Sequence, residues 1–400
     1  MANKIYQTLK RQHYETYFAG GCVRDLLLGV KAQDIDIATS ATPDQVNLLF
    51  AKSIDVGQSF GVTRIIENGE MIEVAVFRND GDYKDGRRPE SIKFSDPEHD
   101  AERRDFTINA LFLDLEKSEV IDYVGGIEDL KNKLIRTVGD PAMRFNEDHL
   151  RILRALRFSA QLGFEIEAPT LDVVKNKKQS LQSVSSERVR EEILKLLKSS
   201  GSAKGLELMS ESGVFEVLLR KPPKEAASLW QKLFPLPKDL NNEIFWLALF
   251  WPLFEEDPKN NWNQVLARVS LSRSERKAMD TALQFMAHRE QWIKSSLGEK
   301  IIFIHENLGP SLLAFTAISQ ANSSIDWQNE FLNLKKEYSL KAPQGSLPEP
   351  FLRGDDVVIL GGPARGVALH KAYVAQLEDL VKSRTEALSW FKDYQEGLKK

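Results

Sequence analysis

Two aspartates, Asp34 and Asp36, lie one residue apart in a segment that alternates polar and apolar residues up to position 38. This alternation is typical of a half-buried strand and predicts that both carboxylates lie on one face. Carboxylate oxygens are preferred ligands of hard divalent cations such as Mg²⁺. Glu73, in a second strand-like run at 71–77, is a candidate third catalytic carboxylate. The alternative for the aspartate pair is a solvated strand edge or an Asx turn.

A glycine pair, Gly20 and Gly21, precedes the aspartates and is followed by Arg24 and Asp25. Glycines let backbone N–H groups approach a phosphate without a Cβ in the way. The apolar run at 26–28 predicts a short helix, and a helix N-terminus favours an anion. By itself a glycine pair is an ordinary turn. Beside the aspartates it predicts a site that holds a triphosphate next to its metal ions, where two Mg²⁺ would serve phosphoryl-group chemistry.

A second cluster contains Arg103, Arg104, Asp105 and Asn109. Arginine is suited to bidentate phosphate contacts, and Asp105 is placed to accept a hydrogen bond from a ribose hydroxyl, which would separate ribonucleotides from deoxyribonucleotides. The alternative is a helix end with surface ion pairs.

The segment before this cluster, 78–89, combines glycine, proline and alternating charge. It predicts a mobile loop that closes over substrate. The candidate loop residues are Asp80, Asp82, Tyr83, Asp85, Arg87 and Arg88.

A third cluster begins at Glu147, and apolar residues at 150, 153, 156 and 158 follow it at helical spacing. Asp148 and Arg151 are three residues apart, so we expect them on one side of that helix. A carboxylate only accepts hydrogen bonds and a guanidinium only donates them. Together they match the amine donor and ring-nitrogen acceptor of cytosine and adenine, and they oppose uracil and guanine. The alternative is a surface ion pair worth a few tenths of a kcal/mol.

The composition is that of an ordinary globular protein of two to four structural units, with 400 residues, 42% hydrophobic and 28% charged. One cysteine, Cys22, excludes internal disulfides and fits a reducing compartment, so we expect a cytoplasmic protein without a secretory signal. Scattered histidines give no Cys/His metal cluster, and no heme or redox cofactor is expected. The apolar stretch 244–254 is too short to span a bilayer, so no membrane partner is expected.

The chain changes character near residue 138. Glycine-bounded strand-like runs come before it and helical spacing comes after it, which predicts an α+β protein with an N-terminal mixed α/β head and a helical remainder. The net charge of −4 does not favour nucleic-acid binding, but residues 151–205 hold 11 Lys+Arg and 6 Asp+Glu. This local excess predicts salt-sensitive attraction to phosphates; the alternative is a solvated helix end.

The three clusters, in this order and spacing, resemble the class II tRNA nucleotidyltransferase and bacterial poly(A) polymerase family. The resemblance implies a polymerase-beta-like head at 1–138, a helical neck that selects the base at 139–205, a helical body at 206–340 and a helical tail that binds tRNA at 341–400. It assigns metal binding to Asp34 and Asp36. It assigns nucleotide binding to the residues Gly20, Gly21, Arg24, Asp25, Arg103, Arg104, Asp105, Asn109, Glu147, Asp148, Arg151 and Arg154.

Departures from the family pattern favour one activity within it. The segment 56–63 lacks the basic, aromatic stretch of poly(A) polymerases, and the C-terminus has no long basic extension. CC-adding relatives typically lack a complete flexible loop, which this chain has. We therefore expect an enzyme that adds or repairs the 3′ CCA end of tRNA, with CTP, ATP and the tRNA 3′ end and acceptor/elbow region as partners and Mg²⁺ as cofactor. Alternatives are an A-adding or CC-adding enzyme, a poly(A) polymerase, a small-molecule nucleotidyltransferase and an inactive RNA-binding protein.

Overall fold

The computed structural model describes residues 1–32, 34–55, 61–67, 69–81, 92–287, 289–308, 327–358 and 360–397. The chain forms two compact units, Met1–Lys221 and Pro222–Lys400. The predicted class is confirmed, since a mixed α/β head is followed by a largely helical remainder. The predicted head at 1–138 and the predicted neck at 139–205 both fall in the first unit. The finer division into head, neck, body and tail stays a prediction.

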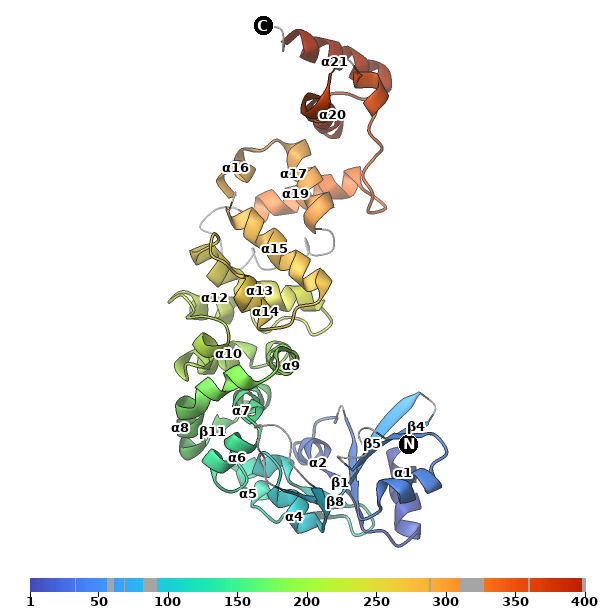
Figure 1. Cartoon of the computed structure of the whole chain (residues 1–400), viewed down its shortest axis with the longest axis vertical. Coiled ribbons are helices and arrows are strands. Elements are labelled where there is room, and N and C mark those ends of the chain that lie inside the picture. Colours follow the sequence, from blue (N-terminus) through green and yellow to red (C-terminus); the bar gives the residue numbers. More distant parts are fainter. Residues whose placement is uncertain are drawn as a thin grey trace. The chain divides into compact units, whose positions relative to one another are not determined.

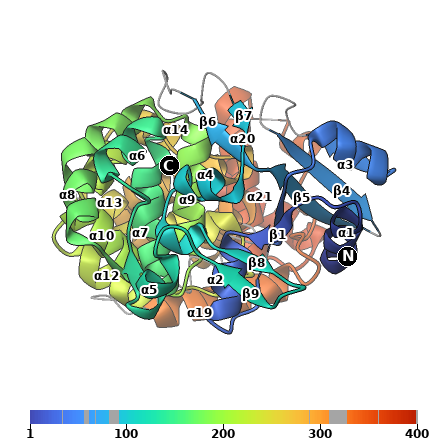
Figure 2. The same ribbon diagram turned by 90° about the horizontal axis from the view of Figure 1, so that it is seen from below.

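A seven-stranded sheet forms the centre of the head, with strand order β3-β4-β5-β2-β1-β8-β9 (Figure 1; Figure 2). Its strands are β1 Thr16–Ala19, β2 Asp36–Thr39, β3 Ser53–Asp55, β4 Val62–Glu67, β5 Glu70–Val76, β8 Phe112–Asp114 and β9 Glu119–Ile121. β2 and β5 run parallel, and the other neighbouring pairs run antiparallel. A separate hairpin pairs β6 Arg78–Asp80 with β7 Ile92–Phe94.

Alternation along the strands divides the sheet into two faces. On one face, Phe18 and Ile37 pack with the helices α1 Ala2–Arg11 and α3 Pro43–Leu49. On the other face, Ala38 joins Phe112 in a second core cluster. Asp36 is two residues from Ala38, so period two places it on this second face.

Short helices connect the head strands and longer helices follow them. The helical elements of the first unit beyond α1 and α3 are α2 Gly21–Leu27, α4 Pro97–Glu102, η2 Thr107–Asn109, α5 Gly126–Lys131, α6 Pro141–Glu147, α7 Leu150–Leu162, α8 Ala168–Lys177, η3 Lys178–Ser183, α9 Ser186–Leu197, α10 Ser202–Glu211 and α11 Val214–Leu218. α7 packs against α9 and α10. One strand interrupts the predicted all-helical neck: β11 Glu165–Ile166 pairs in parallel with β10 Leu134–Ile135.

The second unit is helical in its described residues. Its elements are α12 Ala226–Leu233, α13 Asn242–Glu256, α14 Asn263–Ala267, α15 Arg273–Ala287, α16 Arg289–Lys294, α17 Leu297–Phe303, the π-helical turn η4 Ile304–Leu308, α19 Trp327–Lys341, η5 Gly354–Val357, α20 Gly362–Leu377 and α21 Arg384–Gly397. α13 buries the apolar stretch noted in the sequence and packs against α15. In the described residues, no helix combines the length and apolar character that a membrane span requires. The cytoplasmic location stays a prediction.

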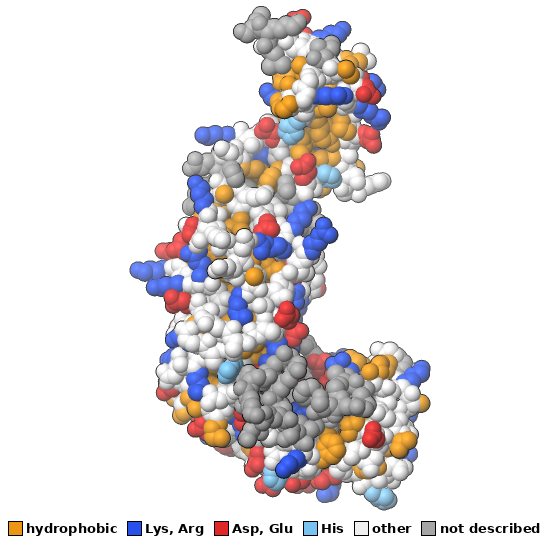
Figure 3. All heavy atoms as spheres, in the orientation of Figure 1, with side chains coloured by type: hydrophobic (Ala, Val, Ile, Leu, Met, Phe, Trp, Pro, Cys, Tyr) orange, Lys and Arg blue, Asp and Glu red, His pale blue; other side chains and the backbone are white. Residues whose placement is uncertain are grey.

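Surface charge of both signs is spread over the face of the molecule drawn in Figure 3, where Lys and Arg side chains lie among Asp and Glu. Mixed charge of this kind fits the small net charge of −4.

Candidate active site

The glycine pair occupies the turn between β1 and α2. Gly20 caps the N-terminus of α2 with φ of +75°, a left-handed conformation that suits glycine. A Cβ at Gly20 would lie 2.8 Å from Nη1 of Arg104. The second cluster of the sequence therefore reaches the glycine turn; the positive φ favours glycine at position 20, and a Cβ there would displace the end of the Arg104 side chain.

Asp36 begins β2 and is paired in register with Glu73 of β5, so two of the three predicted carboxylates are neighbours on the sheet. Asp34 is exposed and precedes the strand. The prediction that both aspartates share one strand face is therefore wrong. On one side of β2, the neighbouring strand β1 ends at Ala19 opposite Asp36, where Gly20 turns the chain into α2.

The carboxyl group of Asp36 has a pKa raised to about 6. Burial is the largest cause, the charge of Glu73 adds to it, Arg104 opposes it and Asp34 adds again. Glu73 itself accepts a hydrogen bond from Nε of Arg64 at 2.8 Å. A buried carboxylate such as Asp36, whose pKa is raised, would gain from a bound cation, because the cation replaces repulsion by attraction.

A complete metal site is not already assembled among the described residues, because no group of three or more His, Cys, Asp or Glu side chains is gathered there. Asp34 and Asp36 nevertheless fit a hard cation by donor type and by the electrostatics of Asp36. Cys22 lies close by and donates from Sγ to the carbonyl oxygen of Ala19 at 3.2 Å. Burial raises the pKa of the Cys22 thiol, which favours a packing role over a nucleophilic one.

Arg103 and Arg104, at the end of α4, both bind a carboxylate that the sequence analysis did not single out. Nη2 of Arg103 lies 2.6 Å from Oδ1 of Asp100, and Nη2 of Arg104 lies 2.9 Å from its Oδ2. Burial alone would raise the pKa of Asp100, but Arg104 and Arg103 hold it below its usual value. The i,i+3 and i,i+4 spacing of these residues on one helix was the signal that could have predicted both pairs.

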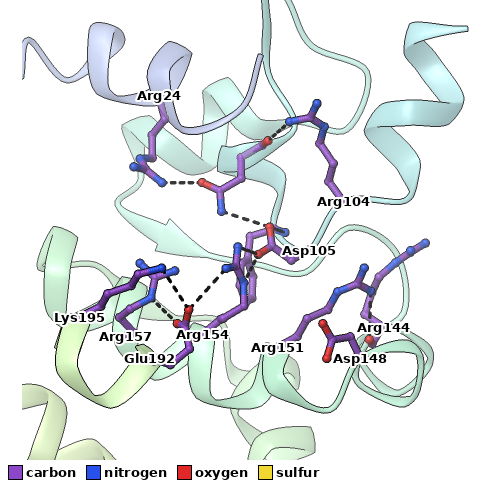
Figure 4. Close-up of polar contacts among 12 residues, drawn as sticks. Arg24, Arg104, Asp105, Arg144, Asp148, Arg151, Arg154, Arg157, Glu192 and Lys195 are labelled. Atoms are coloured by element: carbon purple, nitrogen blue, oxygen red, sulfur yellow. Dashed lines mark hydrogen bonds and ion pairs between the residues drawn. The ribbon is translucent and has the colours of Figure 1, made fainter. Parts of the chain in front are cut away.

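Asp105 is buried, and each of its oxygens has two hydrogen-bond donors (Figure 4). Oδ1 accepts from the backbone N–H of Phe106 and from Nδ2 of Asn109, at 2.8 and 3.2 Å. Oδ2 accepts from Nε and Nη2 of Arg154, at 2.8 and 2.5 Å. Burial acts to raise the pKa of Asp105, yet Arg154 and the nearby Arg151 hold it at about 2. A direct bond from Asp105 to a ribose would have to share or replace these partners.

Arg24 connects this site to the glycine turn. Its Nη1 donates to Oδ1 of Asn109 at 2.6 Å, and its Nε and Nη2 donate to Oδ1 of Asp25 at 2.9 and 2.6 Å. Arg24 is only 4% exposed. The structure thus uses Arg24 and Asp25 to hold the turn, and phosphate binding by them stays a prediction.

The third cluster lies between α6 and the first turn of α7. α7 begins at Leu150, so Asp148 precedes the helix in an extended conformation. The expectation that Asp148 and Arg151 project from the same helix is wrong: the extended backbone of Asp148 ends α6, and its carboxylate accepts from the backbone N–H of Leu150, the first residue of α7.

Internal partners hold both predicted base-selecting side chains. Arg151 donates from Nη1 to Glu147 at 2.5 Å and to the carbonyl oxygen of Arg144 at 3.1 Å, and from Nη2 to the carbonyl oxygen of Arg103 at 3.1 Å. Asp148 binds Arg188 of α9, with 2.7 Å between Nη2 and Oδ2. The structure therefore brings Arg151 next to the second cluster and gives Asp148 a partner from a distant helix.

A buried ion pair joins α7 to α9 beside this cluster. Nε of Arg157 donates to Oε2 of Glu192 at 2.5 Å, and Nη1 of Arg154 lies 3.7 Å from Oε1 of Glu192. The guanidinium of Arg157 also lies 3.7 Å from the ring centroid of Phe158. Sequence reasoning missed Arg157, Arg188 and Glu192, because no local periodicity relates α7 to α9. The sequence signal that could have pointed to Arg157 was the recurrence of arginine at every third position of α7.

The predicted flexible loop falls largely outside the described residues. Asp80 ends strand β6, whereas Asp82, Tyr83, Asp85, Arg87 and Arg88 are not among the described residues. Their assignment to a loop over the substrate stays a prediction.

Comparisons with known proteins agree with this architecture. Residues 16–136 match the family model of the poly(A) polymerase head domain, and residues 163–225 match that of a probable RNA- and SrmB-binding site of polymerase A. A CCA-adding enzyme of Bacillus pumilus is 45% identical over 215 residues, 54% of each chain. One of Anoxybacillus flavithermus is 44% identical over 262 residues, 65% of this chain and 66% of that enzyme. The chain spans about half the length of the first of these curated relatives.

Solved structures resemble the chain over nearly its whole length. The Bacillus stearothermophilus CCA-adding enzyme in complex with CTP has a TM-score of 0.79 and 28% identity, covering 100% of this chain and 98% of that one. The Thermotoga maritima CCA-adding enzyme complexed with tRNA shares the fold, with a TM-score of 0.68 and 23% identity, covering 98% of this chain and 94% of that one. Residues 16–136 and 163–225 thus match models of the poly(A) polymerase family, and the chain as a whole resembles solved CCA-adding enzymes.

Proposed function

We propose that the chain is a tRNA nucleotidyltransferase that adds or repairs the 3′-terminal CCA of tRNA from CTP and ATP, with release of pyrophosphate. The observation that carries this proposal is the arrangement of Asp148 and Arg151, an acceptor and a donor each held by other residues of the same compact unit. The likeness to CCA-adding enzymes, one of them in complex with CTP, supports the same conclusion.

The hydrogen-bonding capacity of the two side chains supports base selection. A carboxylate has about four acceptor positions, and the described contacts to Asp148 occupy three, two on Oδ1 and one on Oδ2. A guanidinium has five N–H donors, and the described contacts of Arg151 use three. An acceptor position on Asp148 and donors on Arg151 therefore remain for a base that offers an amine and a ring nitrogen. Cytosine and adenine have this polarity, and uracil and guanine have the reverse.

The reaction we propose is in-line attack by the 3′ hydroxyl of tRNA on the α-phosphorus of the nucleotide. Mg²⁺ held by Asp34 and Asp36 would supply activation of that hydroxyl and charge neutralisation for the leaving pyrophosphate. The chain's own residues bind and orient the substrates. The backbone at Gly20 and Gly21 would give space for phosphate, Arg104 reaches this turn, and Arg103 is held by the same carboxylate, Asp100.

Asp105 has a less direct part in this proposal than the sequence suggested. Its oxygens already accept hydrogen bonds from Arg154 and Asn109. We therefore assign Asp105 mainly to fixing the shape of the pocket on its ribose side. Any contact of Asp105 with the ribose would use the same oxygens as these two donors. The helical segments after the head, by family likeness, would contact the tRNA acceptor and elbow.

The test offers the protein three tRNAs, one lacking the whole CCA end, one lacking its last two nucleotides and one lacking only the terminal A. CTP and ATP are supplied separately and together with Mg²⁺. Extension of all three to the full CCA end is the expected result. Addition of A alone would indicate an A-adding enzyme, addition of CC alone a CC-adding enzyme, and addition of an A tract a poly(A) polymerase.

Two further results would move the protein out of this class. Nucleotide transfer to a small molecule with no response to added tRNA would indicate a small-molecule nucleotidyltransferase. Binding of tRNA without Mg²⁺-dependent turnover of any nucleotide would indicate an inactive RNA-binding protein.

A further inference from the structure

We propose that Arg188 is a positioning residue for base selection, which holds the Asp148 carboxylate in the one orientation that receives the amine of cytosine or adenine. This inference rests on the proposed function. It concerns a residue of α9 that belongs to none of the three sequence clusters.

The contact between Arg188 and Asp148 is a two-point one. Nη1 of Arg188 lies 3.1 Å from Oδ1 of Asp148, and Nη2 lies 2.7 Å from Oδ2. The two side chains are 22% and 17% exposed, so water competes weakly with the pair. Paired N–H donors on a rigid guanidinium fix the plane of a carboxylate as well as its position.

Asp148 needs such a partner because of where it lies in the chain. It is in an extended stretch between α6 and α7, so helix packing does not set its side chain. The terminal torsion of an aspartate is broad, and free rotation would exchange its two oxygens. The backbone N–H of Leu150 donates to Oδ1 at 3.1 Å, and this contact distinguishes Oδ1 from Oδ2. Arg188 contacts both oxygens of Asp148, and one acceptor position of Oδ2 stays open for the amine of the base.

Both side chains that we propose select the base, Asp148 and Arg151, are held by other residues. Glu147 and two carbonyl oxygens hold Arg151, and Arg188 holds Asp148. A displaced carboxylate would still attract an amine but would no longer align it with Arg151. Arg188 therefore acts on the ratio between matched and mismatched bases, and it acts through Asp148.

The first experiment compares Arg188→Gln, Arg188→Lys and Lys195→Gln with the unchanged protein. Lys195 is on the same helix, its side chain is 60% exposed, and its replacement removes the same charge. The measurement is kcat/KM for CTP and for UTP on a tRNA that lacks its CCA end. In Arg188→Gln the CTP-to-UTP ratio is expected to fall by roughly ten- to a hundredfold, as for a misplaced substrate-orienting group. Arg188→Lys can make only a one-point contact, so its CTP-to-UTP ratio is expected to lie between those of Arg188→Gln and the unchanged protein. Lys195→Gln is expected to keep the ratio of the unchanged protein.

A double substitution separates positioning from a general structural role. If Arg188 acts through Asp148, Arg188→Gln will change the ratio little once Asp148→Asn is present. An equal fall in both backgrounds, or equal losses for CTP and UTP, would overturn the proposal. Should Arg188→Gln fail to fold, as judged by thermal unfolding, the same comparison is made with Arg188→Lys. An unchanged ratio there overturns the proposal too.

The unchanged protein distinguishes failure of this inference from failure of the proposed function. If it does not extend tRNA with CTP and ATP, the proposed function is wrong and the inference falls with it. If it does so with the expected base preference and Arg188→Gln keeps that preference, only the inference is wrong.

Discussion

Arg154 of α7 donates two hydrogen bonds to a single oxygen of Asp105, from Nε at 2.8 Å and from Nη2 at 2.5 Å. The two residues are 49 positions apart, and their contact joins the segment after α4 to the helix that follows the predicted base-selecting cluster. Because Asp105 is 9% exposed and its pKa is held at about 2, this carboxylate is charged at neutral pH and depends on its partners. The position of α7 and the conformation of the segment around Asp105 are thereby coupled.

Removal of that partner is expected to destabilise the first unit. Arg154→Met leaves Asp105 charged and buried with fewer donors, which should cost about 2–3 kcal/mol in the free energy of unfolding. The cost should shrink in the double variant with Asp105→Asn, because no charge then remains unpaired. Denaturant unfolding of the single and double variants measures both values, and equal destabilisation by the two would contradict the coupling.

The raised pKa of Asp36 predicts a dependence of stability on pH and on cation. Its folded value of about 6 lies above the ordinary 3.8, so the folded protein retains a proton that the unfolded chain releases. The contribution of this group to stability is therefore fully present below pH 3.8 and is lost as pH rises through about 6.

Melting temperatures of the unchanged protein and Asp36→Asn, measured from pH 4.5 to 7.5, test this dependence. We expect the variant to lack the decline and Mg²⁺ to stabilise the unchanged protein more at high pH than at low pH. As a control, Asp44→Asn removes an exposed carboxylate of α3 and should leave the profile as it is. Identical profiles for Asp36→Asn and the unchanged protein would refute the assignment.

Asp34 is expected to matter for turnover and not for folding, because it is exposed and precedes β2. Asp34→Ala should abolish incorporation of every nucleotide while the melting temperature stays within about a degree, as for surface substitutions in general. Asp44→Ala, at another exposed aspartate, should retain full turnover. Substantial activity of Asp34→Ala with saturating Mg²⁺ would remove Asp34 from the metal site.

Asp148→Ala is expected to impair base choice more than metal use. Without the carboxylate, the open acceptor position is lost, so CTP and ATP lose their advantage over UTP and GTP. The concentration of Mg²⁺ required for half-maximal turnover should change little, since Asp148 is not among the predicted metal ligands. Retained preference for C and A in this variant would count against the base-selecting role.

Gly20→Ala tests the contact between the glycine turn and Arg104. A left-handed residue with a Cβ costs about 1–2 kcal/mol, and here the added carbon would also lie 2.8 Å from Nη1 of Arg104. Gly29 is a matched control, because its φ is +70° and a Cβ there would meet nothing within 4 Å. Both variants should lose similar stability, but Gly20→Ala alone should raise KM for CTP and ATP. Equal KM values would show that Arg104 moves aside without consequence.

The sequence by itself determined the residue types, their order along the chain and their local spacing. From these followed the α+β class, the strand at Asp36, the short helix after the glycine pair and the helix that begins near Leu150. Hydrogen-bonding polarity is a property of side-chain chemistry, so the base preference assigned to Asp148 and Arg151 also needed only the sequence.

Tertiary structure decided which charges meet. The pairing of Asp148 with Arg188, of Arg157 with Glu192 and of Asp105 with Arg154 joins residues that no local period relates. It also decided where β2 begins, at Asp36, which is the last residue paired with β1. The physical reason is the same in each case: a buried polar group takes whichever partner packing brings within hydrogen-bonding distance, and packing depends on the whole fold.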